Sequence, residues 1–93
     1  MIIGACSVKL HIFEVYSLKD KRQVIKSILG RLQSRFNISV AEVDHFDIWQ
    51  SSVIGFACVS NETAHVRSII NNVIRFVDSD GRVEITAHEI EIL

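Results

Sequence analysis

The stretch that decides the fold spans residues 2–36 and reads IIGACSVKLHIFEVYSLKDKRQVIKSILGRLQSRF. Apolar and polar side chains alternate over residues 2–14, and a period of two is typical of a strand that buries one face. Residues 17–36 instead repeat their apolar side chains about every 3.6 residues, as an amphipathic helix does. Ser17 suits the N-cap of that helix, and Asp20 can reach back to the preceding backbone. The sequence therefore predicts a long strand followed by a helix that packs on it.

The rest of the chain continues the alternation of strands and helices. Three further strands are expected, over residues 38–43, 53–59 and 83–92. The first of them needs one bulge to bring its apolar residues to one face, and the last needs a bulge or break near residues 87–89. A second helix is expected from a cap at Ser60 or Asn61 to about Asp78.

The resulting order, β-α-β-β-α-β, is that of the ferredoxin-like fold, in the α+β class. Right-handed crossovers place both helices on one face of a four-stranded antiparallel sheet, with the first and third strands in its centre. A chain of 93 residues is the size of one domain, so residues 1–93 are expected to form a single ferredoxin-like domain. The other face of the sheet carries no helices, which makes it a candidate interaction surface.

Composition limits the classes of function. Hydrophobic residues make up 48% of the chain and charged residues 23%, which argues for a folded protein and against disorder. A net charge of −1 does not mark a nucleic-acid binder by overall charge. The N-terminus lacks a basic leader and no apolar run is long enough to span a membrane, so we expect a cytoplasmic protein without membrane contact. Cys6 and Cys58 lie far apart in apolar runs, as reduced, buried cysteines do.

Several enzyme classes with this architecture lack their motifs here. The cysteines are not clustered for an iron–sulfur centre, and the four glycines are isolated, so no phosphate-binding loop is present. No serine or cysteine has a recognisable base and orienting group around it. We therefore expect no enzyme activity, no cofactor, no catalytic or metal-ligating residues and no small-molecule substrate.

Two strings, SLKDKRQVIKSIL and RFNISVAEVDHFDIWQ, closely resemble the YlxP-like family of small bacterial proteins of unknown function. The resemblance runs over nearly the whole chain, including NVIRFV in the second expected helix and the acidic last strand. It implies a ferredoxin-like fold, in agreement with the order of elements. Genes of this family often lie near those for translation initiation and ribosome maturation, which suggests a role around the ribosome or RNA. No activity is established for the family, so the resemblance implies no catalytic residues.

Charge is distributed unevenly along the chain. Residues 1–37 carry seven cations and two anions, a net +5, whereas residues 38–93 carry three cations and nine anions, a net −6. Six of the cations lie on the first expected helix, and they are Lys19, Lys21, Arg22, Lys26, Arg31 and Arg35. Such a helix can follow the phosphates of rRNA or contact a ribosomal protein, helped by its positive N-terminus. The alternative is a solvated helix whose long side chains cover the edges of the apolar stripe.

The segment after the second expected strand, EVDHFDIWQ, is the densest in polar chemistry. Its candidate residues are Glu42, Asp44, His45, Asp47, Trp49 and Gln50. Carboxylates with an imidazole can bind a divalent metal, although an extended strand directs Asp44 and His45 to opposite faces. The structural alternative is an Asx-type turn, with Asp44 and Asp47 bonded to backbone amides and Trp49 covering an edge of the core. Contact with a partner is a third interpretation.

The uncovered face of the sheet is predicted to carry Lys9, His11, Val53 and Ala57. Ferredoxin-like RNA binders stack bases on aromatic residues of their central strands, and Val53 and Ala57 cannot do so. An RNA-recognition-motif mechanism is therefore not expected. Small apolar side chains on an open face favour burial against a second copy, as a homodimer or larger homo-oligomer.

These observations lead to one principal hypothesis and two alternatives. The principal hypothesis is a non-enzymatic cytoplasmic accessory protein that associates with the ribosome or RNA through its basic first helix. The first alternative is a homo-oligomeric protein-interaction module that uses the open sheet face. The second is a metal-binding site at the turn formed by residues 44–49.

Overall fold

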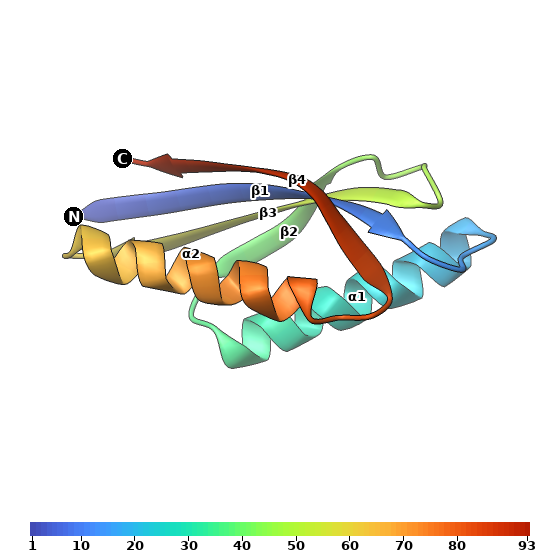
Figure 1. Ribbon diagram of the computed structural model, residues 1–93, viewed down its shortest axis with the longest axis horizontal. Coiled ribbons are helices and arrows are strands. Elements are labelled where there is room, and N and C mark those ends of the chain that lie inside the picture. Colours follow the sequence, from blue (N-terminus) through green and yellow to red (C-terminus); the bar gives the residue numbers. More distant parts are fainter.

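The computed structural model describes the whole chain, residues 1–93, as one sheet covered by two helices (Figure 1). Its elements are β1 (Ile2–Ile12), α1 (Leu18–Arg35), β2 (Ser39–Asp44), β3 (Ser51–Ser60), α2 (Thr63–Asp78) and β4 (Val83–Ile92). The strands are antiparallel to their neighbours in the order β2-β3-β1-β4, so β1 and β3 are central. Both helices lie on the same face of the sheet. The structure thus confirms the predicted ferredoxin-like α+β fold.

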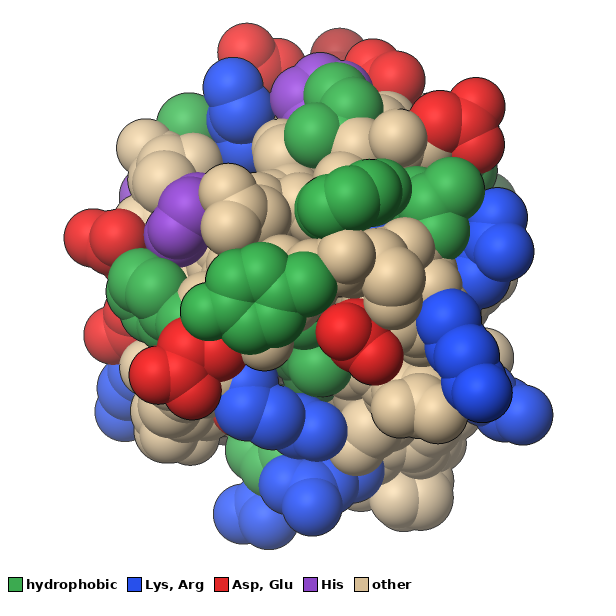
Figure 2. Space-filling model, turned by 90° about the vertical axis from the view of Figure 1, so that its right-hand side faces the viewer, with side chains coloured by type: hydrophobic (Ala, Val, Ile, Leu, Met, Phe, Trp, Pro, Cys, Tyr) green, Lys and Arg blue, Asp and Glu red, His purple; other side chains and the backbone are tan.

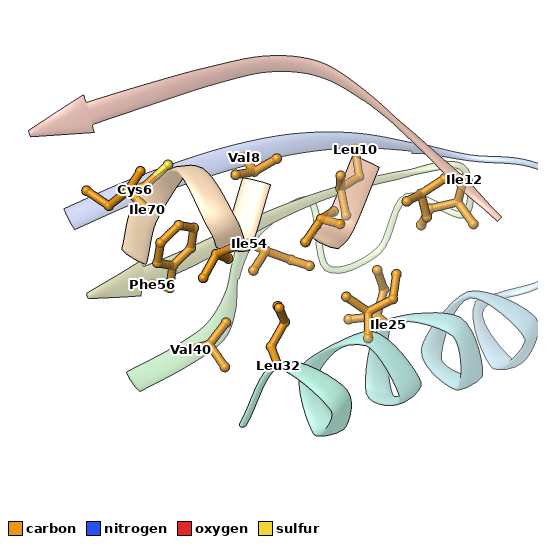
Figure 3. Packing of buried hydrophobic residues seen from close by; sticks show 14 of the residues in the cluster. Cys6, Val8, Leu10, Ile12, Ile25, Leu32, Val40, Ile54, Phe56 and Ile70 are labelled. Atoms are coloured by element: carbon orange, nitrogen blue, oxygen red, sulfur yellow. The ribbon is translucent and has the colours of Figure 1, made fainter. Parts of the chain in front are cut away.

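The core lies between the sheet and the helices (Figure 3). Alternate residues of the central strands enter it in register, with Val8 opposite Ile54 and Cys6 opposite Phe56. The helices contribute one buried stripe each, which consists of Ile25, Ile28 and Leu32 in α1 and Val66, Ile70, Val73 and Val77 in α2. Each such side chain contributes about 1.5–3 kcal/mol when fully buried, so this interface holds the two layers together.

Two bulges set which side chains face the helices. In β2 the register shifts between Glu42 and Asp44, which confirms the predicted bulge and leaves Val43 unpaired. In β4 the shift falls at Thr86, one residue before the predicted range, because Ile85 pairs with Leu10 and Ala87 with Lys9. Beyond this bulge, two of the three glutamates of the strand, Glu89 and Glu91, lie opposite Ser7 and Ala5 on the open face.

The two helices begin differently. Ser17 caps α1 as predicted, since its Oγ accepts a hydrogen bond from the Asp20 amide at 3.1 Å. The Asp20 carboxylate in turn accepts from the Tyr16 amide at 3.3 Å. The N-cap of α2 is Glu62, which makes no side-chain capping bond, so the predicted cap at Ser60 or Asn61 is wrong. Ser60 instead accepts from the Glu62 amide and shapes the turn before the helix.

The turn between α2 and β4 is tied to α1. Asp80 and Arg82 form an ion pair with Oδ2 and Nη2 2.7 Å apart, and Arg82 also donates to Ser27 Oγ at 3.2 Å. Hydrogen bonds from the Arg82 side chain hold the pKa of the Asp80 carboxyl below its ordinary value. This pair anchors the start of β4 beside the middle of α1.

Gly4 and Gly30 provide a matched pair of tests of the packing. A Cβ at Gly4 would overlap Val66 Cγ1, whereas a Cβ at Gly30 would meet nothing within 4 Å. We expect Gly4→Ala to lower the free energy of unfolding by about 1–3 kcal/mol, because α2 must move away from β1. Gly30→Ala should raise it by about 0.5–1 kcal/mol through helix propensity. Urea denaturation measures both, and equal effects would contradict this packing.

Candidate functional site

One end of the molecule brings together the β1–α1 connection, the start of α1 and the β2–β3 connection. The molecule is elongated, with extents of 43 × 20 × 17 Å, and both connections lie at the right-hand end in Figure 1. The Ile12 amide donates to the Gln50 carbonyl oxygen at 3.0 Å, which joins the two connections. We call this region, residues 13–26 and 44–50, the loop end.

A buried lysine organises the loop end. The side chain of Lys21 is 1% exposed, and its ammonium donates to the carbonyl oxygens of His45 and Phe46, the latter at 3.3 Å. The ammonium also forms an ion pair with Glu42 Oε2 at 3.2 Å. Glu42 Oε2 accepts a further hydrogen bond from Ser52 Oγ at 2.6 Å. All three donors of the ammonium therefore have acceptors, as burial of a charge requires.

This burial corrects one sequence prediction. The sequence places Lys21 among the cations that contact a partner. In the structure its ammonium is buried and paired with Glu42, so it cannot contact a partner. Its position holds the reason: Lys21 is four residues before Ile25 and seven before Ile28, so it falls on the core-facing stripe of α1. This spacing indicates a core-facing position, although a lysine is usually expected to face water.

The backbone of the loop end is strained at two points. Glu14 and His45 have positive φ angles of 55° and 60°, and they are the non-glycine residues of the chain with this conformation. Each costs about 1–2 kcal/mol relative to ordinary backbone, so each connection needs contacts that hold it. At His45 these are the bond from Lys21 to its carbonyl, the bond from its amide to Asp44 Oδ1 (2.7 Å) and the contact of its Nδ1 with Ser51 Oγ (2.8 Å).

The polar residues of the 42–50 segment do not converge on one point. Asp44 stabilises the turn, in line with the structural alternative, and Gln50 contributes its carbonyl to Ile12. Asp47 is exposed and makes no side-chain hydrogen bond within the chain. No three histidine, cysteine or carboxylate side chains lie close enough together to hold a metal ion. The structure therefore does not assemble the metal site proposed from Asp44, His45 and Asp47.

Apolar side chains are exposed at the loop end. Trp49 is 50% exposed, Phe46 53% and Tyr16 71%, and Ile48 is exposed beside them. We call these four residues the aromatic tip. Figure 2 views this end directly and shows hydrophobic side chains gathered in the middle of the face, with lysine and arginine side chains below. Trp49 therefore keeps half of its surface in water, more than a residue that only covers an edge of the core needs, and the exposed patch is a candidate binding surface.

The other predicted cations of α1 are exposed and lie on two flanks. Lys19, Arg22 and Lys26 lie one helical turn apart on the flank opposite Arg31 and Arg35, which we call the lysine flank, and it begins in the first turn of α1 at the loop end. Arg31 and Arg35 face the α2 side, where the Arg35 guanidinium lies 5.0 Å from the centre of the Phe76 ring. Neither ion pair of the chain involves any of these five residues. Their charges are therefore available to an anionic partner.

The open face of the sheet has a different character. Lys9, His11, Val53 and Ala57 lie on it as predicted, since all four are out of phase with the core residues of β1 and β3. A shallow trough of about 830 Å³ crosses this face over Ala5, Ser7, Gly55 and Ala57. The face is not basic throughout, because Glu89 and Glu91 of β4 line the trough.

The two cysteines are free and buried in the core. Burial raises the pKa of the Cys6 thiol to about 11 and also raises that of Cys58. Both thiols therefore remain protonated at neutral pH, the form in which cysteine is a poor nucleophile. Neither helix is long and apolar enough to cross a membrane.

The fold and these surfaces define a small ferredoxin-like domain with one open sheet face and one internally braced loop end. The chain belongs to the family described as "Protein of unknown function (DUF503)", whose model matches residues 3–90. It is similar to "Uncharacterized protein YlxP" of Bacillus subtilis (strain 168), with 36% identity over 85 residues that cover 91% of this chain and 92% of the relative. The predicted family is therefore confirmed. Lys21 joins the two strings that carry the resemblance, since it lies in the first and bonds to residues of the second.

Substitution of Lys21 tests whether it braces the loop end. Lys21→Met removes the cation paired with the Glu42 carboxylate and takes one donor from each of the His45 and Phe46 carbonyl oxygens, so we expect the free energy of unfolding to fall by about 3 kcal/mol. Lys19→Met, two residues away and exposed, should change it by less than about 0.5 kcal/mol. Urea denaturation of both variants measures the difference. Similar small losses for the two variants would show that the buried ammonium does not stabilise the fold.

Proposed function

We propose that this protein is a non-enzymatic cytoplasmic accessory protein that binds RNA in the setting of the ribosome, through the lysine flank of α1. The observation that carries the proposal is the set of exposed cations Lys19, Arg22 and Lys26, which have no carboxylate partner within the chain. Unpaired cations on one helix flank are suited to phosphates, because they gain charge-assisted bonds without breaking existing ones.

The charge distribution in the fold supports this proposal. The exposed charges of α1 are one anion, Asp20, and five cations, which are Lys19, Arg22, Lys26, Arg31 and Arg35. Glu84, Glu89 and Glu91 lie on β4, whose register places them on the open face away from the helices. A phosphate chain therefore meets a local field much more positive than the net charge of −1 indicates. The setting near the ribosome follows the gene neighbourhood of the YlxP-like family.

Binding to rRNA should depend steeply on salt. Three cations that neutralise phosphates give a log–log slope of about −2 to −3, measurable by filter binding or anisotropy from low to high salt. Arg22→Glu combined with Lys26→Glu should weaken binding at least about tenfold at 0.1 M salt and flatten the slope. Lys9→Glu with Arg67→Glu is the matched control, since it changes the net charge equally at exposed sites elsewhere.

Two results would contradict the proposal. The first is an affinity for ribosomal fractions that is absent or independent of salt. The second is an equal loss of binding in the control double variant, because the effect would then belong to net charge and not to the lysine flank.

A second candidate function is homo-oligomerisation through the open sheet face. Its floor of alanine, glycine and serine allows a second sheet to approach closely. Along β1 and β4 the face carries Lys9 with Glu84 at one end and the two carboxylates Glu89 and Glu91 at the other. A twofold axis across the strands places the Lys9 end of one copy over the acidic end of the other, which is the self-complementarity that a closed dimer needs.

The oligomer is tested by sedimentation at tens of micromolar protein. We expect a dimer in the unchanged protein and a monomer for Ala57→Arg, which places a charged side chain in the middle of the open face. Gln33→Arg, on the exposed side of α1, is the control and should remain dimeric. A monomer in the unchanged protein at these concentrations removes this function.

A further inference from the structure

We infer that the RNA bound by this protein is single-stranded, with unpaired bases stacked on the aromatic tip while the lysine flank holds their phosphates. This inference rests on the proposed function and specifies its ligand. The observation behind it is the placement of aromatic residues. The chain has seven of them, of which Phe13, Tyr16, Phe46 and Trp49 are exposed at the loop end. The other three, Phe36, Phe56 and Phe76, are buried or partly buried in the core.

The aromatic tip is held in place before any ligand binds. The carbonyl oxygens of His45 and Phe46 are bonded to the Lys21 ammonium, and the Ile48 amide donates to the His45 carbonyl at 3.2 Å. The positive φ of His45 is maintained by these bonds, although it is unfavourable for a residue with a side chain. Because the backbone is already fixed, stacking on Phe46 and Trp49 requires only that their side-chain rotamers be set, which lowers the entropic cost of binding.

The lysine flank can bind the phosphates of nucleotides that extend from the bases stacked on the aromatic tip. Lys19 and Lys26, the ends of the lysine flank, are seven positions apart in α1, which is about 10 Å along the helix axis. Arg22 directly follows the buried Lys21, whose ammonium donates to the carbonyl oxygen of Phe46 in the aromatic tip. A positive surface beside aromatic side chains is the combination by which proteins hold single strands, since stacking acts on the bases and charge acts on the backbone.

The geometry favours unpaired nucleotides over a duplex. In A-form RNA the bases are stacked on one another and the major groove is too narrow for side chains, so exposed rings find no partner there. Asp44 and Asp47 are also exposed at the loop end. Carboxylates repel the two phosphate strands of a duplex but can accept hydrogen bonds from the amino groups of splayed bases. The open sheet face offers Ala5, Gly55 and Ala57 at its centre, none of which can stack on a base.

The only tryptophan of the chain gives a direct test, since Trp49 lies in the aromatic tip. The probes are a single-stranded RNA of about 12 nucleotides of mixed sequence and the duplex that it forms with its complement. We expect the single strand to quench the Trp49 emission and to bind at least about tenfold more tightly than the duplex. Trp49→Ala and Phe46→Ala, followed by anisotropy of labelled RNA, should each weaken binding about tenfold. Val59→Ala, an exposed apolar residue on the open face, is the control and should change nothing.

The outcomes separate this inference from the proposed function. Equal affinity for single strand and duplex, with unchanged Trp49 emission and a persisting effect of Arg22→Glu with Lys26→Glu, would overturn the inference and leave RNA binding through α1 intact. No binding of either RNA, with folding confirmed by circular dichroism, would overturn both. A loss of binding to a ribosomal protein in Trp49→Ala, with RNA binding unaffected, would make the aromatic tip a protein contact and would also overturn the inference.

Discussion

The buried ammonium of Lys21 is the interaction on which the functional part of this molecule depends. It is the one charged group of α1 that points into the core, and its acceptors come from β2 and from the β2–β3 connection. A rigid helix carries the donor, so the position of the connection is set by α1 and not by the connection itself. Removing a charge from water is costly unless it is fully bonded, which makes this arrangement sensitive to any change in Glu42 or the His45 backbone.

The same constraint explains why exposed aromatic side chains are compatible with a stable domain. The core that α1 and α2 form with the sheet is complete without the rings of Phe46 and Trp49. Lys21 bonds to the main-chain carbonyl oxygens of the β2–β3 connection from the core side, so the rings are not needed to anchor this connection. They are therefore free to remain in water, where apolar surface tends to be buried by a partner.

Periodicity predicted the elements well because a strand or helix pattern is local. The alternation in residues 2–14 and the stripe through Ile25, Ile28 and Leu32 were sufficient for the order of elements and the sheet. The direction of Lys21 and the exposure of Trp49 were not predicted, because both depend on contacts between segments more than twenty residues apart. A lysine on a core-facing helical position is the sequence signal for such a contact. It becomes informative when a carboxylate such as Glu42 lies near the end of a following strand.

The fold places acidic and basic side chains on two different surfaces, although the net charge of the chain is only −1. The bulge at Thr86 turns Glu89 and Glu91 onto the open face, while the cations remain on the helices. An acidic open face repels phosphates, so the sheet that other ferredoxin-like proteins use for RNA is electrostatically unsuited to it here. A polyanion can therefore bind only at the helical side or the loop end. Self-association through the sheet would not block that route, because the lysine flank lies on the other side of the molecule.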